Sequence, residues 1–180
     1  MQDTGIVRRI DELGRVVIPK ELRRTLRIRE GDPLEIYTQN DQLVFKKYSP
    51  LAGLTENASA VADGIKEITE CACLITDTDK VLYVSDGRVK DLLDKPISVD
   101  VDRILKERRC VVIEGGGYKK IILTQGGEAQ TSSVIIAPVV ANGDCYGAVI
   151  MIDSGAREFA FSNGKKFVEL GASFLSKQFE

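Results

Sequence analysis

The chain has 180 residues, a length typical of one or two domains. Hydrophobic residues make up 43% and charged residues 29% of it, and the net charge of −2 excludes a protein that is basic throughout. It contains no histidine, which excludes a Ser-His-Asp triad, a Cys-His nucleophile pair and any zinc site that needs imidazole. An enzyme built from this chain would have to use carboxylates, lysines, tyrosines or thiols.

Charge is divided unevenly along the chain. Residues 1–53 carry ten Lys/Arg against eight Asp/Glu, whereas residues 54–180 carry fifteen against nineteen. The first 29 residues are more basic still, with eight basic side chains against four acidic ones. The break at Ser49–Gly53 therefore predicts two domains: a basic head, residues 1–50, and an acidic body, residues 54–180.

The head alternates short strand patterns with turn signals around one short helix. The predicted elements in chain order are strand 5–10, turn 11–14, strand 15–18, helix 20–26, turn 30–33 and strands 34–38 and 43–47. Pro19 is predicted at the first helical position, and Asn40-Asp41 is predicted as the turn of a hairpin.

The predicted helix has an apolar stripe and a basic stripe. Its apolar stripe consists of Ile18, Leu22 and Leu26. Its basic stripe consists of Lys20, Arg23, Arg24 and Arg27. A segment this short buries too little surface for easy stability on its own, and it has no disulfide or metal site. We therefore expect two heads to share one core in a dimer.

The body is predicted to begin and end with a helix. Helical spacing runs from Leu54 to Ile68 and from Ser162 to Phe179. Between them we predict strands 71–76 and 81–85, a helical insert at 88–108 broken at Pro96, and strands 110–114, 118–124, 132–140 and 144–152. Asn142-Gly143 indicates a hairpin between the last two strands. The closing helix is apolar nearly all round, so one face can meet its own sheet and the rest suits a partner helix.

Other chemical motifs favour structural roles. The four cysteines, Cys71, Cys73, Cys110 and Cys145, lie in apolar stretches without a CxxC spacing, and we interpret them as small buried hydrophobic residues. The glycines at 115–117 and 126–127 lack a phosphate-loop spacing and indicate turns. The clustered aspartates at 77, 79, 91, 94, 100 and 102 suit turns and helix caps better than a metal cage. We predict no cofactor and no metal.

No apolar run approaches the length of a membrane helix, and no apolar signal core follows the N-terminus. The expected location is the cytoplasm, with no membrane partner and an association with the nucleoid.

The basic residues of the head suit an anionic partner. Arg8 lies between Ile6 and Ile10 on a predicted strand, and arginine outnumbers lysine around the helix. Guanidinium groups match phosphate oxygens and guanine edges, and dimerisation would double the surface. This pattern predicts contact with nucleic-acid phosphates.

The head resembles the AbrB family of bacterial transition-state regulators. The resemblance rests on Thr4–Arg8, Asp11–Pro19, Glu21–Leu26 and Leu34–Tyr37. It implies a swapped-hairpin β-barrel dimer and DNA contact by Arg8, Arg15, Arg23 and Arg24, with Arg9 and Lys20 as basic neighbours. The order of elements in the body is similar to that of a GAF sensor domain.

The predicted fold class is α+β, with an AbrB-like dimer domain followed by a GAF-like antiparallel sheet with flanking helices. The resemblance implies a sporulation-type transcription regulator, an activator or a repressor, that binds AT-rich or deformable double-stranded DNA. Its other expected partners are itself, as a dimer or tetramer, and a small-molecule effector of the body. Two alternatives stay open: an antitoxin with the same head fold, and a thiol-dependent GAF-like enzyme.

Overall fold

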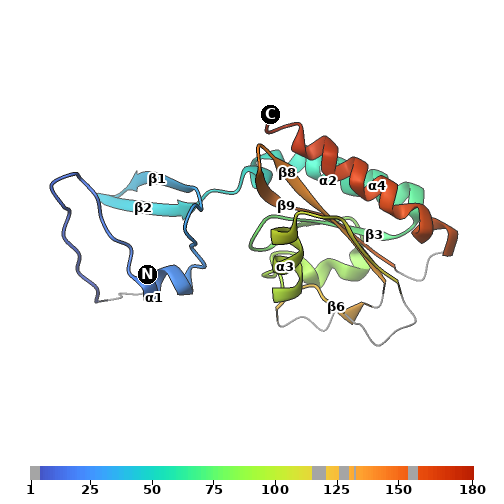
Figure 1. Ribbon diagram of the computed structural model, residues 1–180, viewed down its shortest axis with the longest axis horizontal. Helices are drawn as coiled ribbons and strands as arrows, with labels where there is room; N and C mark the ends of the chain where they lie inside the picture. The colour runs from blue at the N-terminus through green and yellow to red at the C-terminus, as the bar shows by residue number, and fades with distance from the viewer. Residues whose placement is uncertain (1–4, 115–120, 126–129, 132, 154–157) are drawn as a thin grey trace. The chain divides into compact units, whose positions relative to one another are not determined.

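The computed structural model describes residues 5–114, 121–125, 130–131, 133–153 and 158–180. The chain divides into two compact units, Met1–Tyr48 and Ser49–Glu180 (Figure 1). The first unit corresponds to the head; the second contains the body together with the connecting segment. The glycine turns predicted at 115–117 and 126–127 lie outside the described residues.

The head contains one helix and one hairpin. Helix α1 spans Lys20–Thr25, and strands β1 (Leu34–Gln39) and β2 (Gln42–Lys47) pair antiparallel with Ile36 opposite Phe45. Asn40 and Asp41 connect the strands with φ angles of 47° and 60°, as a two-residue type I′ turn requires. The predicted hairpin is confirmed.

The first part of the head differs from its prediction. Residues 5–10 and 15–18 were expected as strands, but they are irregular here. The turn between them is present, with the Gly14 amide donating to the Asp11 carbonyl at 3.0 Å. A strand needs a neighbour for its amides and carbonyls, and the sheet of the head pairs only β1 with β2. The prediction of strands was therefore wrong for the single chain.

The body follows the predicted order of elements. Its elements are η1 (Pro50–Leu54), α2 (Thr55–Thr69), β3 (Ala72–Thr76), β4 (Val81–Val84), η2 (Gly87–Leu92), α3 (Val99–Glu107), β5 (Val111–Ile113), β6 (Ile121–Ile122), β7 (Gln130–Thr131), β8 (Val134–Ala141), β9 (Asp144–Ile152) and α4 (Glu158–Ser176). The predicted helical insert is a 3₁₀-helix followed by an α-helix, and the predicted strand 118–124 is described as a strand only over β6.

Five strands of the body form one antiparallel sheet in the order β4-β3-β9-β8-β5. Helices α2 and α4 lie side by side on one face and α3 on the other (Figure 1). Cys73 and Ile75 pack in the core below α2 and α4, while Leu74 between them packs in the core on the α3 face. Because both faces are covered, β8 is an almost uninterrupted apolar run. The α+β class is confirmed.

The β8–β9 hairpin holds the end of the closing helix. The predicted Asn142-Gly143 turn is confirmed, with φ angles of 51° and 85°. In the ladder Val139 faces Gly147 and Val140 faces Cys145, so Tyr146 is the extra residue of a β-bulge. The Tyr146 ring lies 4.5 Å from the ring of Phe179, and the Asn142 side chain donates to the Phe179 carbonyl at 3.0 Å.

Helix α4 covers the sheet with only part of its apolar surface. Val168, Ala172 and Leu175 are buried against the sheet, as predicted for one face. Leu170 is 68% exposed and Phe174 is 47% exposed, one helical turn apart. These two residues form an uncovered apolar stripe, which we call the α4 stripe.

Candidate nucleic-acid interface

Helix α1 presents three of the six predicted basic residues. Lys20, Arg23 and Arg24 are all exposed, and no described residue forms an ion pair with their side chains. Pro19 caps the helix from outside rather than occupying its first position, because its ψ of 146° is not helical. The position predicted for Pro19 was therefore off by one residue.

The C-terminal end of α1 is closed by a Schellman motif. The Ile28 amide donates to the Arg23 carbonyl at 2.8 Å, and the Arg27 amide donates to the Arg24 carbonyl at 3.3 Å. Arg27 adopts the left-handed conformation with φ of 53°. It therefore lies beyond the helix and is half-buried, which corrects its assignment to the basic stripe of the helix.

The other three predicted residues lie on the segment before α1, and all are exposed. Arg8 donates to the neighbouring Val7 carbonyl at 3.3 Å. The Asp11 carboxylate accepts from the Arg15 amide and from Arg15 Nε, both at 2.8 Å. These bonds from Arg15 hold the pKa of Asp11 below its usual value. The Asp11–Arg15 pair fixes the turn and orients Arg15, while its exposure limits its effect on stability.

The structure therefore groups the six residues into two sets. Lys20, Arg23 and Arg24 share one short helix, whereas Arg8, Arg9 and Arg15 lie on the segment that precedes it. Among the described residues, no hydrogen bond or ion pair joins the two sets. Sequence reasoning missed one feature nearby, a contact between Lys47, Asp32 and the carbonyl of Arg27.

The head has no apolar core of its own. Pro19 is the one apolar residue of the described head that is buried, and the hydrophobic core of the chain begins at Leu51. Its exposed large apolar residues are Ile6, Val7, Ile10, Leu13, Val16, Val17, Leu26, Ile36, Tyr37, Leu43, Phe45 and Tyr48. Leu22, predicted to face inward, is only half-buried. So much uncovered apolar surface in so short a unit is typical of a protein–protein contact.

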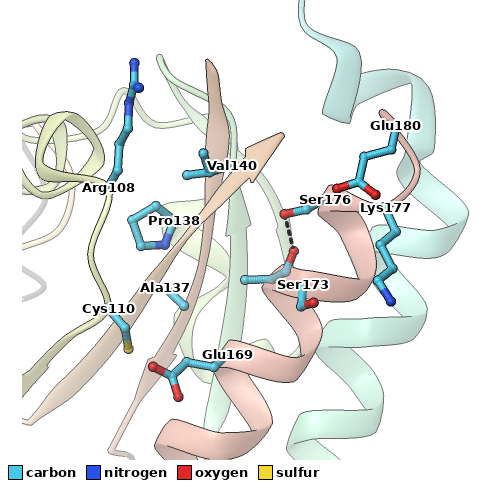
Figure 2. Close-up of a pocket in the computed structure, with 11 residues that line it drawn as sticks. Arg108, Cys110, Ala137, Pro138, Val140, Glu169, Ser173, Ser176, Lys177 and Glu180 are labelled. Carbon is cyan, nitrogen blue, oxygen red and sulfur yellow. Dashed lines mark hydrogen bonds between the residues drawn. The ribbon is translucent and has the colours of Figure 1, made fainter. Parts of the chain in front are cut away.

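The body has a groove of about 350 Å³ beside α4 (Figure 2). Pro138 and Val140 of β8 line it on one side and Ser173 and Ser176 of α4 on the other. Arg108 and Lys177 contribute positive charge, and Glu169 and Glu180 contribute negative charge. The groove is therefore mixed in charge and could hold a polar small molecule.

The surroundings of Cys73 and Cys110 disfavour the reactive thiolate form. Cys110 lies in the groove near Glu169 (Figure 2), and burial, reinforced by the Glu169 carboxylate, raises its pKa to about 11. Burial raises the pKa of the Cys73 thiol well above its usual range. Since the thiolate is the reactive form, both residues are protonated near neutral pH. Cys71 and Cys73 are buried as predicted, while Cys110 and Cys145 are only partly buried.

Carboxylates of the body serve turns and caps. Asp77 Oδ1 accepts from the amides of Asp79 and Lys80, both at 2.7 Å, and Asp100 and Asp102 lie in the first turn of α3. The described residues contain no cluster of three or more potential metal ligands. Within the same described ranges, no helix is both long and apolar enough to cross a membrane.

Comparisons with known proteins cover both units. A family model described as "Stage V sporulation protein T C-terminal, transcription factor" matches residues 53–180, and one described as "Antidote-toxin recognition MazE, bacterial antitoxin" matches residues 7–51. Stage V sporulation protein T of Bacillus subtilis (strain 168) is 43% identical over 181 residues, which cover 100% of this chain and 99% of that protein.

Two further relatives resemble one unit each. The transition state regulatory protein AbrB of the same organism is 64% identical over 50 residues, 28% of this chain and 52% of that protein. The GAF domain of Acinetobacter phosphoenolpyruvate-protein phosphotransferase superposes on 69% of this chain and 80% of its own, with a TM-score of 0.56 and 13% identity. At that identity the likeness shows the fold of the body alone.

These findings define a transcription regulator with an AbrB-type head and a GAF-like body. The chain belongs to the stage V sporulation protein T family. The resemblance to AbrB drawn from residues 4–37 is thereby confirmed, and the regulator is favoured over the antitoxin and the thiol enzyme.

Proposed function

We propose that the head binds double-stranded DNA through Arg8, Arg15, Arg23 and Arg24, with Arg9 and Lys20 as supporting contacts. One observation carries this proposal: α1 exposes Lys20, Arg23 and Arg24 without an ion-pair partner among the described residues. Guanidinium groups in this state are ready to bind phosphate. The AbrB relative supports the same role, because its N-terminal domain is described as a DNA recognition domain.

Specificity of this interface rests mainly on the shape of DNA. Helix α1 has the sequence KELRRT and lacks the Asn or Gln that would read adenine. Phosphate contacts position a protein on the duplex without reading bases. We therefore assign AT-rich or otherwise deformable promoters as targets. Such sequences require the least free energy to bend the duplex or to obtain a narrow minor groove. The protein then acts on promoters in the nucleoid, and we assign it no catalytic step.

The head acts as a dimer in this proposal. Its exposed apolar residues can be buried only against another apolar surface, and a second head offers an identical one. The irregular segments 5–10 and 15–18 would gain strand partners in the shared sheet. A swapped-hairpin dimer of this kind brings the arginines of two chains to one DNA molecule.

The body contributes self-association and effector sensing. The α4 stripe leaves two large apolar side chains for the same helix of another chain, so head pairs and body pairs together allow a tetramer. The groove beside α4 offers a place for a small effector with both charges. An effector would alter DNA binding only if it bound two states of the protein with different affinity.

DNA binding itself is tested by fluorescence anisotropy of the full chain with AT-rich and GC-rich duplexes at moderate salt. We expect the wild type to bind both and to favour the AT-rich duplex. The variant with alanine at positions 8, 15, 23 and 24 should bind neither, while its circular dichroism stays unchanged, because those side chains contribute nothing to the core. Equal binding by this variant and the wild type would overturn the proposal.

The α4 stripe is tested by Leu170→Glu with Phe174→Glu. A charge in a contact between apolar helices costs several kcal/mol, so this variant should drop to a dimer held by the heads. Multi-angle light scattering measures the mass. Ser173→Glu is the control, because Ser173 is exposed on the flank of α4 that lines the groove. An unchanged mass of the double variant would remove α4 from the assembly.

A further inference from the structure

A half-buried contact ties the end of β2 to the segment that follows α1. Lys47 Nζ lies 3.1 Å from Asp32 Oδ2 and donates to the Arg27 carbonyl at 3.3 Å. The side chains of Lys47 and Asp32 are only 18% and 21% exposed. Most other ion pairs of the described chain have at least one partner more than a third exposed, so this pair is unusually sheltered.

Asp32 in turn fixes the loop that follows α1. Its Oδ2 accepts from the Arg29 amide at 2.8 Å, and its own amide donates to the Arg29 carbonyl at 3.2 Å. One carboxylate thus connects the loop to the ammonium group of Lys47 on β2. The three residues Lys47, Asp32 and Arg27 form a unit that we call the clasp.

Helix α1 needs such support. It has six residues and buries none of them, whereas isolated helices of this length are unstable in water. Its last turn depends on Arg27, a residue with a side chain in a left-handed conformation that favours glycine. The Lys47 ammonium binds the carbonyl of that strained residue and also places a positive charge at the negative end of the helix.

We propose that Lys47 and Asp32 are positioning residues for DNA binding: the clasp holds α1 so that Arg23 and Arg24 meet the phosphates, and Lys47 does not itself contact DNA. This inference rests on the DNA binding proposed above. Its geometry is internal to the head and joins residues 20 positions apart in the chain. Lys46, by contrast, is exposed on the same strand and is a plain surface charge.

The first test asks whether Asp32→Asn raises or lowers the affinity for DNA. Asp32→Asn removes a negative charge from a basic surface, so simple electrostatics would strengthen DNA binding. The clasp predicts the opposite, a loss of about tenfold, because the neutral amide holds the ammonium more weakly. Asp41→Asn at the hairpin tip removes the same charge without touching the clasp and should bind DNA at least as well as wild type.

Lysine variants supply the second measurement. Lys47→Gln should lose about tenfold more affinity than Lys46→Gln, although both remove one charge. Lys47→Arg should retain most of the affinity, because a guanidinium can still donate to Asp32 and the carbonyl. The double variant of Asp32→Asn and Lys47→Gln should lose no more than Lys47→Gln alone. Circular dichroism of every full-length variant checks that the helix and sheet signal is retained.

The outcomes separate the two proposals. Wild-type binding together with equal or tighter binding by Asp32→Asn overturns the clasp and leaves the DNA-binding head intact. Equal losses of DNA affinity in Lys46→Gln and Lys47→Gln also overturn the clasp. This comparison still tests the clasp if Asp32→Asn fails to fold. No binding by wild type or by Lys46→Gln overturns the proposed function and the clasp with it.

Discussion

Replacing Arg8, Arg15, Arg23 or Arg24 singly by alanine is expected to make DNA binding less dependent on salt. If two chains each use these four arginines on phosphates, log affinity should fall against log salt with a slope of roughly −7. One substitution removes a contact from each chain of a dimer, so the slope should become shallower by about two units. Anisotropy titrations at several salt concentrations measure the slope.

The control for this series is Lys177→Ala, which removes an exposed positive charge from the body. It should leave the slope unchanged, because the phosphate contacts of this proposal are all made by residues of the head. A slope that stays near the wild-type value in all four arginine variants would show that these residues do not contact phosphates. Leu22→Ala should weaken binding differently, by destabilising the shared core of the heads.

The body was largely predictable because its signals are local. The Asn142-Gly143 turn and the strands on either side of it are encoded within about twenty residues, and beyond Asp144 the paired core strands are almost entirely apolar. The extra residue at Tyr146 was not predicted. A bulge places one extra residue in one strand of a pair. The sequence pattern of either strand alone does not indicate whether its partner carries such a residue.

The secondary structure of the head was less predictable from local sequence patterns. Segments 5–10 and 15–18 have a strand pattern, but a strand forms only against a partner, and the single chain supplies none. The helix end was misplaced for another reason. A glycine usually marks the left-handed residue after a helix, and here Arg27 occupies that position.

The sequence predicts which residues form the candidate interface. It does not predict the contacts that hold those residues in position. Exposed arginines at helical spacing can be read from the sequence, because charged side chains seldom lie in a core. The Lys47–Asp32 contact could not be read, because it depends on how the loop after α1 returns to β2. Lys46 and Lys47 are identical neighbours in the sequence, and only the structure separates the exposed side chain from the sheltered one.

The replacement Gly147→Ala is expected to destabilise the body more than any surface change. Gly147 lies beside the bulge with φ of 152°, which side-chain-bearing residues rarely adopt. An added Cβ would collide with the Thr76 carbonyl oxygen and lie 2.8 Å from Cδ1 of Leu51, which is fully buried in the core of the body. Backbone cannot move aside as a flexible side chain can, so β3 and β9 would have to separate locally.

We expect Gly147→Ala to lower the free energy of unfolding by about 3 kcal/mol or more, the upper end for overpacked cores, and the melting temperature by roughly 10 °C. Gly64→Ala is the matched control. Gly64 lies inside α2 with nothing within 4 Å of an added Cβ, so the same replacement should stabilise the protein by about 0.5–1 kcal/mol. Differential scanning calorimetry of the full chain compares the two. A Gly147→Ala protein that melts with the wild type would show that β9 does not approach Thr76 as closely as the structure places it.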